Sequence, residues 1–357
     1  MDVVAGLLVE RARADNATYQ DIRDYRAQCT LDTCPLSDSY WGYLPSLAAN
    51  GLFIGLFGLS LLLYVGQAVA AKRFLGFSIA MICGDILEVL GYIGRIMAHD
   101  EPFKEDPFLL QIVTLTIGPA FFAAGIYFCL SRIVSTISPA ASRIPPAWYP
   151  RIFIPCDVIS LLLQAAGGGL ASARTHANED PSVGNDIMIA GLAFQVITLF
   201  CFICLSVDFG LRAWRKVRAA GAGAVLAQEA HLVRLRHSAR FRLFLAALAF
   251  ATLCIFTRCV YRVAELSDGW NGRLIKTQSF FIGLEGAVVG AAVLALNACH
   301  PGLCFKEGDT VERGAFGFGR RRKAAGKTSQ QESQLGSEEG EVGVVKSVGD
   351  EQRQEEK

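Results

Sequence analysis

The sequence predicts an all-α polytopic membrane protein, a seven-transmembrane helix bundle with its N-terminus outside and its C-terminus in the cytoplasm. Three observations support this fold class. Of the 357 residues, 52% are hydrophobic and 19% are charged, whereas a soluble domain carries about 25% charged residues. The apolar residues gather in long runs, and the loops between the runs alternate in charge. With a mean hydropathy of +0.36, a soluble two-domain enzyme is excluded.

The apolar runs each have the length of about 20 residues that a helix needs to cross a bilayer core of about 30 Å. Apolar side chains surround each predicted helix, as expected for a segment that faces lipid or neighbouring spans. The predicted spans are 46–69, 75–97, 108–131, 152–171, 187–210, 243–264 and 279–299.

Positive charge in the loops predicts the orientation, because Lys and Arg concentrate in cytoplasmic loops. Segments 70–74, 132–151 and 211–242 together hold thirteen Lys and Arg residues, whereas 98–107, 172–186 and 265–278 hold four. The first set is therefore predicted to be cytoplasmic. The near-zero net charge of +1 conceals this asymmetry.

The polar ends predict two further regions beside the seven-helix domain at 46–300. Residues 1–45 form an extracellular tail that we expect to precede an uncleaved signal anchor, because the first 28 residues hold many charges and no apolar core. Its candidate modifications are N-glycosylation at Asn16 and a disulfide between Cys29 and Cys34. Residues 301–357 are predicted to be a disordered cytoplasmic tail, because 306–357 is too polar to bury a core. The basic run 320–323 in it is interpreted as a solvated group that helps to fix orientation or touches anionic lipid.

Polar side chains inside the spans are the candidate functional residues, because an ionisable group in a bilayer costs several kcal/mol unless it is paired or hydrated. At 100° per residue, the polar residues of the second span share one face, as do those of the sixth. The candidates along a substrate path are Asp85, Glu88, Tyr92, Arg95, Tyr127, Asp157, Gln164, Gln195, Arg258, Arg262, Glu265 and Glu285.

Two interpretations of this set remain open. Carboxylates on several helices predict a polar pocket or path that binds the cationic head group of an amphiphile, and the set as a whole favours this. Alternatively, these residues form buried ion pairs that hold the helices in register. Pro119 and Pro155 fall inside predicted spans and can open backbone carbonyls to a cavity.

This sequence lacks the residues that several other activities of seven-helix proteins require. All five histidines lie in loops or at span ends, so a membrane zinc hydrolase is not predicted. Residues 279–299 contain no Lys for a retinal Schiff base, and neither a Walker A loop nor a nucleophile elbow is complete. We expect no enzyme activity, no catalytic residue, no metal and no cofactor, and no binding of nucleic acid.

Several motifs together resemble the fungal RTA-like lipid-translocating exporter family. They cover most of 40–302 in order: 88–95 (EVLGYIGR), 119–127 (PAFFAAGIY), 157–160 (DVIS), 164–169 (QAAGGG), 191–195, 258–265 (RCVYRVAE) and 300–302 (HPG). One stretch departs from the family pattern of Glu, Tyr and Asp at the entry to the seventh span, where this chain has Gln278, Ile282 and Glu285. If substrate contacts depend on that stretch, specificity or activity differs here.

The resemblance implies a multi-pass protein of the fungal plasma membrane that exports sphingoid long-chain bases or similar toxic amphiphiles. Its partners are then membrane lipids and an amphipathic cationic lipid substrate, and the oligomeric state stays open. The alternative is a seven-helix lipid or stress sensor that signals through the basic loop 211–242. The acidic-Arg-Tyr and Asn-Pro signatures of common receptors are absent, which weakens this alternative.

Overall fold

The structure, a computed structural model, describes residues 18–72, 74–221, 230–268 and 272–305. In these ranges every regular element is helical, and the chain contains seven helices that are long and apolar enough to cross a membrane. The predicted all-α fold with seven spans is confirmed, whereas the orientation of the termini stays a prediction. The sequon at Asn16, the polar tail 306–357 with its basic run 320–323, and part of the loop 211–242 lie outside the described residues.

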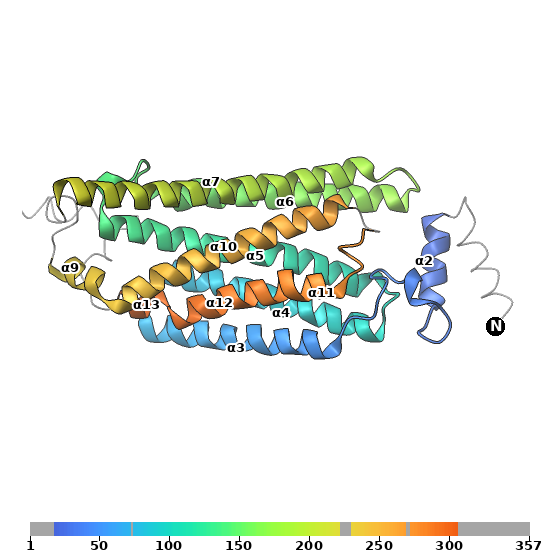
Figure 1. The fold of residues 1–357 in the computed structure, drawn as a ribbon. Helices are drawn as coiled ribbons and strands as arrows, with labels where there is room; N and C mark the ends of the chain where they lie inside the picture. Colours follow the sequence, from blue (N-terminus) through green and yellow to red (C-terminus); the bar gives the residue numbers. More distant parts are fainter. Residues whose placement is uncertain (1–17, 73, 222–229, 269–271, 306–357) are drawn as a thin grey trace, which may run out of the picture. The chain divides into compact units, whose positions relative to one another are not determined.

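The first six spans are single helices, and they bundle side by side (Figure 1). They are α3 (Leu47–Ala71), α4 (Leu75–Asp100), α5 (Glu105–Ile137), α6 (Trp148–His176), α7 (Ser182–Ala220) and α10 (Ala239–Ser267). Most run further than predicted: α5 has 33 residues and α7 has 39. Hydropathy marks only the part in the apolar core, whereas backbone hydrogen bonding continues into polar sequence.

The seventh span is built from three consecutive segments. A short α11 (Gln278–Phe280) leads into the π-helix η3 (Phe281–Ala287), and α12 (Val288–Ala298) completes the crossing. A π-helix is rare and commonly occurs at functional sites, because its wider turn redirects side chains. Here the π-helix contains Glu285, which is fully buried.

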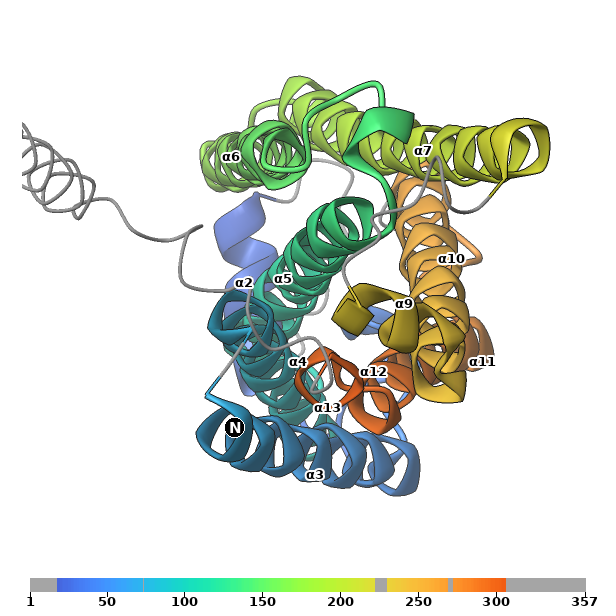
Figure 2. The same ribbon diagram turned by 90° about the vertical axis from the view of Figure 1, so that its left-hand side faces the viewer.

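The helices pack as neighbouring pairs, with α4 against α3 and α5, α6 against α7, and α10 against α12 (Figure 2). The α6–α7 pair is tight because glycines face the neighbouring backbone. A Cβ on Gly167 would lie 2.4 Å from the backbone nitrogen of Met188, and one on Gly184 would lie 2.4 Å from that of Ala171. Small residues of this kind allow close approach of membrane helices.

The outward faces of the bundle are apolar. Leu62 and Leu52 on α3 are 70% and 67% exposed, and Leu162 on α6 and Leu243 on α10 are similarly open. Leucines exposed on several helices form a surface that water does not favour but lipid does. The burial pattern therefore agrees with a multi-pass membrane protein.

The segment 18–45 lies at one end of the bundle, which we call the α2 end after the helix α2 (Tyr19–Gln28) that it contains (Figure 1). Thr18 and Asp21 cap α2 reciprocally, and Cys29 and Cys34 are joined by a disulfide. The Tyr19 hydroxyl donates to Glu105 at 2.9 Å. The pKa of Tyr19 is raised. The larger cause is burial of the side chain, and the second is this hydrogen bond to Glu105.

The opposite end, which we call the α13 end, carries α9 (Ala230–His237) and α13 (Pro301–Cys304). His300 caps α13 by accepting from the Gly302 backbone N–H at 3.1 Å, and its other ring nitrogen lies 3.3 Å from the Ser78 hydroxyl. The side chain is fully buried, and burial lowers the pKa of His300 to about 4. His300 is therefore neutral in the folded protein at pH 7.

Candidate functional site: an ionisable core in the helix bundle

All twelve residues predicted to lie along a substrate path are buried. Their exposed fractions are at most 6%. They do not form one cluster, because the structure divides them among six groups at different depths and between different helices. These groups are centred on Glu88 with Glu285 and Arg258, on Asp85, on Arg95, on Arg262 with Glu265, and on two separate pairs that involve α6.

The central group joins α4, α5, α10 and the π-helix. Arg258 Nε donates to Glu285 Oε1 at 3.0 Å, and Arg258 Nη2 donates to the same carboxylate and to the carbonyl of Leu115. This ion pair is fully buried. It ties the sixth span to the seventh, so the ion-pair interpretation holds for these two residues.

Glu88 lies beside this ion pair without joining it. Its side chain interacts electrostatically with Glu285 and Arg258, yet within the described ranges neither of its buried carboxyl oxygens has a hydrogen-bond partner. The space that it occupies exists because position 118 is glycine, whose Cβ site is 3.1 Å from Glu88 Oε1. The group therefore holds two carboxylates and one guanidinium.

Tyr92 closes the central group on the side of the α2 end. Its hydroxyl is buried without a hydrogen-bond partner, and its ring packs with Phe53, Phe57 and Phe281. Tyr92 interacts electrostatically with Glu88 and Glu285 on the side of the α13 end, and with Arg95 on the side of the α2 end. An aromatic layer of Tyr92 and Phe281 thus separates two polar levels.

Asp85 belongs to a separate network nearer the α13 end. Ser60 donates to Asp85 Oδ2 at 2.7 Å, and Asn297 donates to the Ser60 hydroxyl at 2.6 Å. The network connects α3, α4 and α12 through the hydroxyl of Ser60. Asp85 therefore has a structural partner, although its second oxygen remains without one.

Arg95 is surrounded by neutral groups at the α2 end. Its three nitrogens donate to Asn50 Oδ1, Gln111 Oε1 and the Tyr43 hydroxyl at 3.1, 3.1 and 2.9 Å. Its guanidinium also lies 3.9 Å from the ring centre of Phe281. Arg262, on the facing helix α10, pairs with Glu265 and donates to Thr116.

The remaining candidates lie between α5, α6 and α7. Asp157 lies beside Tyr127, whose ring packs against Phe153 and Phe202. Gln164 donates to Gln195 at 3.2 Å and so bridges α6 and α7. We assign the glutamine pair to helix packing, because its hydrogen bond joins α6 to α7 where glycines bring the two helices close together.

Sequence reasoning missed the uncharged partners of the charged groups. These are Tyr43, Asn50, Ser60, Gln111, Thr116 and Asn297. Three of these residues could have been noticed in the sequence, because Asn and Gln are uncommon in apolar runs. The predicted set included the amides Gln164 and Gln195 but omitted Asn50, Gln111 and Asn297.

The departures from the family pattern lie around the π-helix. Gln278 begins α11, and Ile282 packs against the hydrophobic core from within the π-helix. Glu285, by contrast, supplies the carboxylate to Arg258. Of the three positions, Glu285 is the one placed in the ionisable core.

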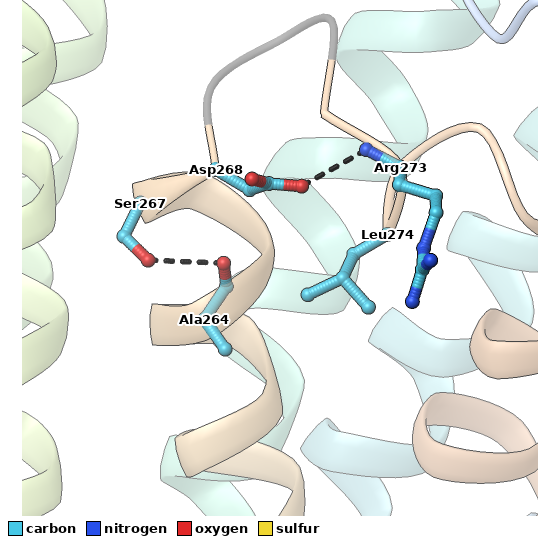
Figure 3. Close-up of a pocket in the computed structure, with 5 residues that line it drawn as sticks. All are labelled: Ala264, Ser267, Asp268, Arg273 and Leu274. Atoms are coloured by element: carbon cyan, nitrogen blue, oxygen red, sulfur yellow. Dashed lines mark hydrogen bonds between the residues drawn. The ribbon is translucent and has the colours of Figure 1, made fainter.

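The polar groups do not line a wide passage in this conformation. A cavity of about 30 Å³ touches Arg95, Arg262 and Glu265, which is too small for a whole amphiphile with its alkyl tail. A larger surface pocket of about 440 Å³ lies at the turn after α10 and is lined by Ala264, Ser267, Asp268, Arg273 and Leu274 (Figure 3). No predicted site residue lines it. Movement of a substrate through the core therefore requires the helices to separate.

Metal binding has no structural support within the described ranges. No group of three or more His, Cys, Asp or Glu side chains there is arranged to hold a metal ion. The chemistry available in the core is the binding of charged and hydrogen-bonding groups.

Comparison with known proteins places this arrangement in a family. The chain is 36% identical over 311 residues to the sphingoid long-chain base transporter RSB1 of Saccharomyces cerevisiae, covering 82% of this chain and 80% of the relative. It is 27% identical to protoporphyrin uptake protein 1 (61% of this chain, 67% of the relative) and 27% identical to protein RTM1 (59% and 62%) of the same yeast. No solved structure matches.

The family model described as RTA1 like protein matches residues 81–308. The match begins within α4 and covers α5, α6, α7, α10 and the π-helix. It includes all twelve candidate core residues. With seven membrane-spanning helices and this match, the chain belongs to the RTA1-like protein family.

Proposed function

We propose that this protein moves amphipathic cationic lipids, of the sphingoid long-chain base class, across the plasma membrane. The observation that carries the proposal is the central group of Glu88, Glu285 and Arg258. A second buried carboxylate, Glu88, lies there beside the ion pair of Arg258 with Glu285. The similarity to a relative named as a long-chain base transporter supports this substrate class.

The charges of the central group suit one ammonium ion. When both carboxylates are ionised, Glu88, Glu285 and Arg258 sum to one negative charge, which an incoming cation neutralises. A protonated amine has three N–H donors, and the two oxygens of Glu88 have no donor of their own. Charge-assisted hydrogen bonds of this kind are stronger than neutral ones.

The alkyl tail of such a substrate needs no polar path. The bundle is apolar outside, so the tail can remain in lipid while the head group passes between helices. Opening is expected near α4, α10 and the π-helix, because these elements carry the charged side chains of the central group. A π-helix has a weaker hydrogen-bond ladder than an α-helix and is suited to such rearrangement.

Orientation and reaction class belong to the same proposal. The segment 18–45 is placed outside, as the charge asymmetry of the loops and the Cys29–Cys34 disulfide support. The protein is proposed to be a transporter and not an enzyme, since its relatives are named for transport and uptake. The sensor alternative has no such support.

The test is transbilayer movement of a fluorescent long-chain base in liposomes that contain the purified protein. We expect faster movement than in protein-free vesicles, and Glu88→Gln slows it by at least about tenfold, a loss of about 1.4 kcal/mol of transition-state stabilisation. Equal rates with and without the wild-type protein contradict the proposal.

The matched control is Glu101→Gln, which removes the carboxylate of a residue outside the bundle core, where it pairs with Lys104. We expect this variant to keep the wild-type rate. A fluorescent phosphatidylcholine serves as the second control, because a lipid without net charge gains nothing from an anionic core. Equal acceleration of both lipids indicates a non-selective scramblase instead.

A further inference from the structure

The cavity at the α2 end of the core is lined by more positive than negative charge. Its ionisable lining residues are Arg95, Arg262 and Glu265. Arg262 pairs with Glu265, so the charge of Arg95 is left over. Arg95 is 1% exposed, and within the part of the chain that the structure describes its hydrogen-bond partners are all neutral.

A buried guanidinium without a counter-ion is expensive, because it has left water and gains no Coulombic attraction in return. The Phe281 ring beside Arg95 offsets part of this cost through a cation–π contact. The Asn50, Gln111 and Tyr43 oxygens use three of its five N–H groups. These neutral contacts leave the net positive charge of the residues that line the cavity unchanged.

A second group points to a ligand at the same cavity. The Nε–H of Arg262, a residue that lines the cavity, is buried without a hydrogen-bond partner. The other two nitrogens of Arg262 are used by Glu265 and Thr116. The cavity therefore has an unused donor in addition to an uncompensated charge.

The nearest other carboxylates act on Arg262 electrostatically, but among the described residues they form no ion pair with Arg95 or Arg262. Glu88 and Glu285 belong to the next level, on the far side of the aromatic layer formed by Tyr92 and Phe281. Glu285 is already bound to Arg258. The cavity therefore borders the central group, and Arg95 is its one charged lining residue without an ion-pair partner among the described residues.

From these observations we propose that the cavity between Arg95 and Arg262 binds a single small inorganic anion of the size of chloride. Its volume of about 30 Å³ is small, which favours a monatomic anion over a larger one such as a lipid phosphate. The ligand would be held by guanidinium N–H groups from α4 and α10. This goes beyond lipid movement and does not depend on it.

The test is the thermal stability of the detergent-solubilised full chain in sodium chloride and in sodium gluconate of equal ionic strength. Gluconate is too large for the cavity. A ligand that binds the folded state raises stability with its concentration, so we expect the Tm to rise by about 3 °C or more and to saturate by about 150 mM chloride. Line broadening of the ³⁵Cl resonance by the protein measures binding directly.

The most informative variant is Gln111→Glu. The Gln111 oxygen already accepts from Trp41 Nε1 at 3.0 Å and from Arg95 Nη1 at 3.1 Å, so a glutamate of the same shape supplies the missing negative charge from within. We expect this variant to have a higher Tm than the wild type in gluconate and to show no chloride dependence. A merely structural role for Gln111 predicts a loss of stability instead.

Two further variants complete the test. Arg95→Gln removes the uncompensated charge and is expected to abolish the chloride-dependent rise, but it also breaks three hydrogen bonds. Arg174→Gln, an arginine near the end of α6 outside the cavity lining, is the control that keeps the full rise. An identical Tm of the wild-type protein in both salts, or an unchanged chloride response in Gln111→Glu, overturns the proposal.

Discussion

The Cβ site of Gly118 on α5 lies 3.1 Å from the Oε1 atom of Glu88 on α4. This distance is shorter than an ordinary van der Waals contact, so a side chain at position 118 competes with the carboxylate for space. Gly118 thus determines where Glu88 lies relative to Glu285 and Arg258. Helix α5 shapes the proposed cation site without contributing a charge to it.

Substitution of Gly118 by valine is expected to impair transport more than it impairs folding. The added methyl groups push the Glu88 carboxylate away from the central group, and overpacking of this kind costs about 1–3 kcal/mol of stability. We expect long-chain base movement to fall by at least about tenfold at equal amounts of reconstituted protein. Gly55→Val, where nothing lies within 4 Å of the Cβ site, is the control and keeps the wild-type rate. Normal movement in Gly118→Val contradicts the assigned role of this glycine.

Removal of Arg258 is expected to destabilise the protein strongly. Arg258→Met leaves Glu285 as a buried charge without its partner, which costs about 3–5 kcal/mol. The measurement is Tm in detergent. The double variant Arg258→Met with Glu285→Leu restores most of the stability, because an apolar pair of similar volume replaces the ion pair.

The same double variant separates stability from function. It lacks one of the two carboxylates of the central group, so transport is expected to remain low although the fold is recovered. Full transport by the double variant would falsify the role of Glu285 in cation binding. If the double variant is as unstable as the single one, the ion pair is needed for packing.

His300 is expected to make the protein less stable in acid. Its pKa in the folded state is about 4 because it is buried, whereas an unfolded histidine has a pKa of about 6.5. Between these values the unfolded state binds the additional proton, so stability is fully present above about pH 6.5 and is lost as pH falls toward 4. The largest loss from this group is about 3 kcal/mol.

The pH test compares the wild type with His300→Asn. Asparagine is a good N-cap and preserves a partner for the Gly302 N–H, but it does not titrate. We expect the difference in Tm between pH 7 and pH 4.5 to be smaller in His300→Asn. An equal difference in both proteins assigns acid sensitivity to other groups.

The close contact of α6 and α7 depends on Gly167. Gly167→Ala places a methyl group 2.4 Å from the backbone nitrogen of Met188, and backbone cannot move aside as a side chain can. We expect the helices to shift and the stability to fall by about 1–3 kcal/mol. The measurement is Tm in detergent.

Gly169→Ala is the matched control on the same helix, because nothing lies within 4 Å of its Cβ site. Alanine has the higher helix propensity, so this variant is expected to be as stable as the wild type or slightly more so. A similar loss in both variants indicates that the alanine changes the helix itself and that the interhelical contact is not responsible.

Hydropathy predicted the number of spans because the transfer of apolar side chains into lipid is a local and additive property. The ends of the helices were placed less well. Helix α7 extends to Ala220, ten residues past the predicted end at 210, through a basic stretch that hydropathy counts as loop. The π-helix around Glu285 has no sequence signal that we recognise, because it depends on how the seventh span packs against α3 and α10.

The ionisable residues of the core were also found from the sequence, because a charge inside a membrane needs a partner or water and is therefore rare. The hydrogen-bond and ion-pair partners of these residues were not found from the sequence. Asp85, Glu88 and Arg95 share a face of α4 as the helical period predicts, yet they take part in three different groups. Residues on one face are separated along the helix axis, and neighbours at each depth come from other spans.

The sequence by itself determined that the chain crosses the membrane seven times and that a few charged side chains are enclosed by it. Both follow from composition and local periodicity. Only the tertiary structure decided that Arg258 binds Glu285 and that, among the described residues, Glu88 has no hydrogen-bond partner and Arg95 no counter-ion. Pairing depends on distances between residues far apart in the chain, and those distances are determined by packing.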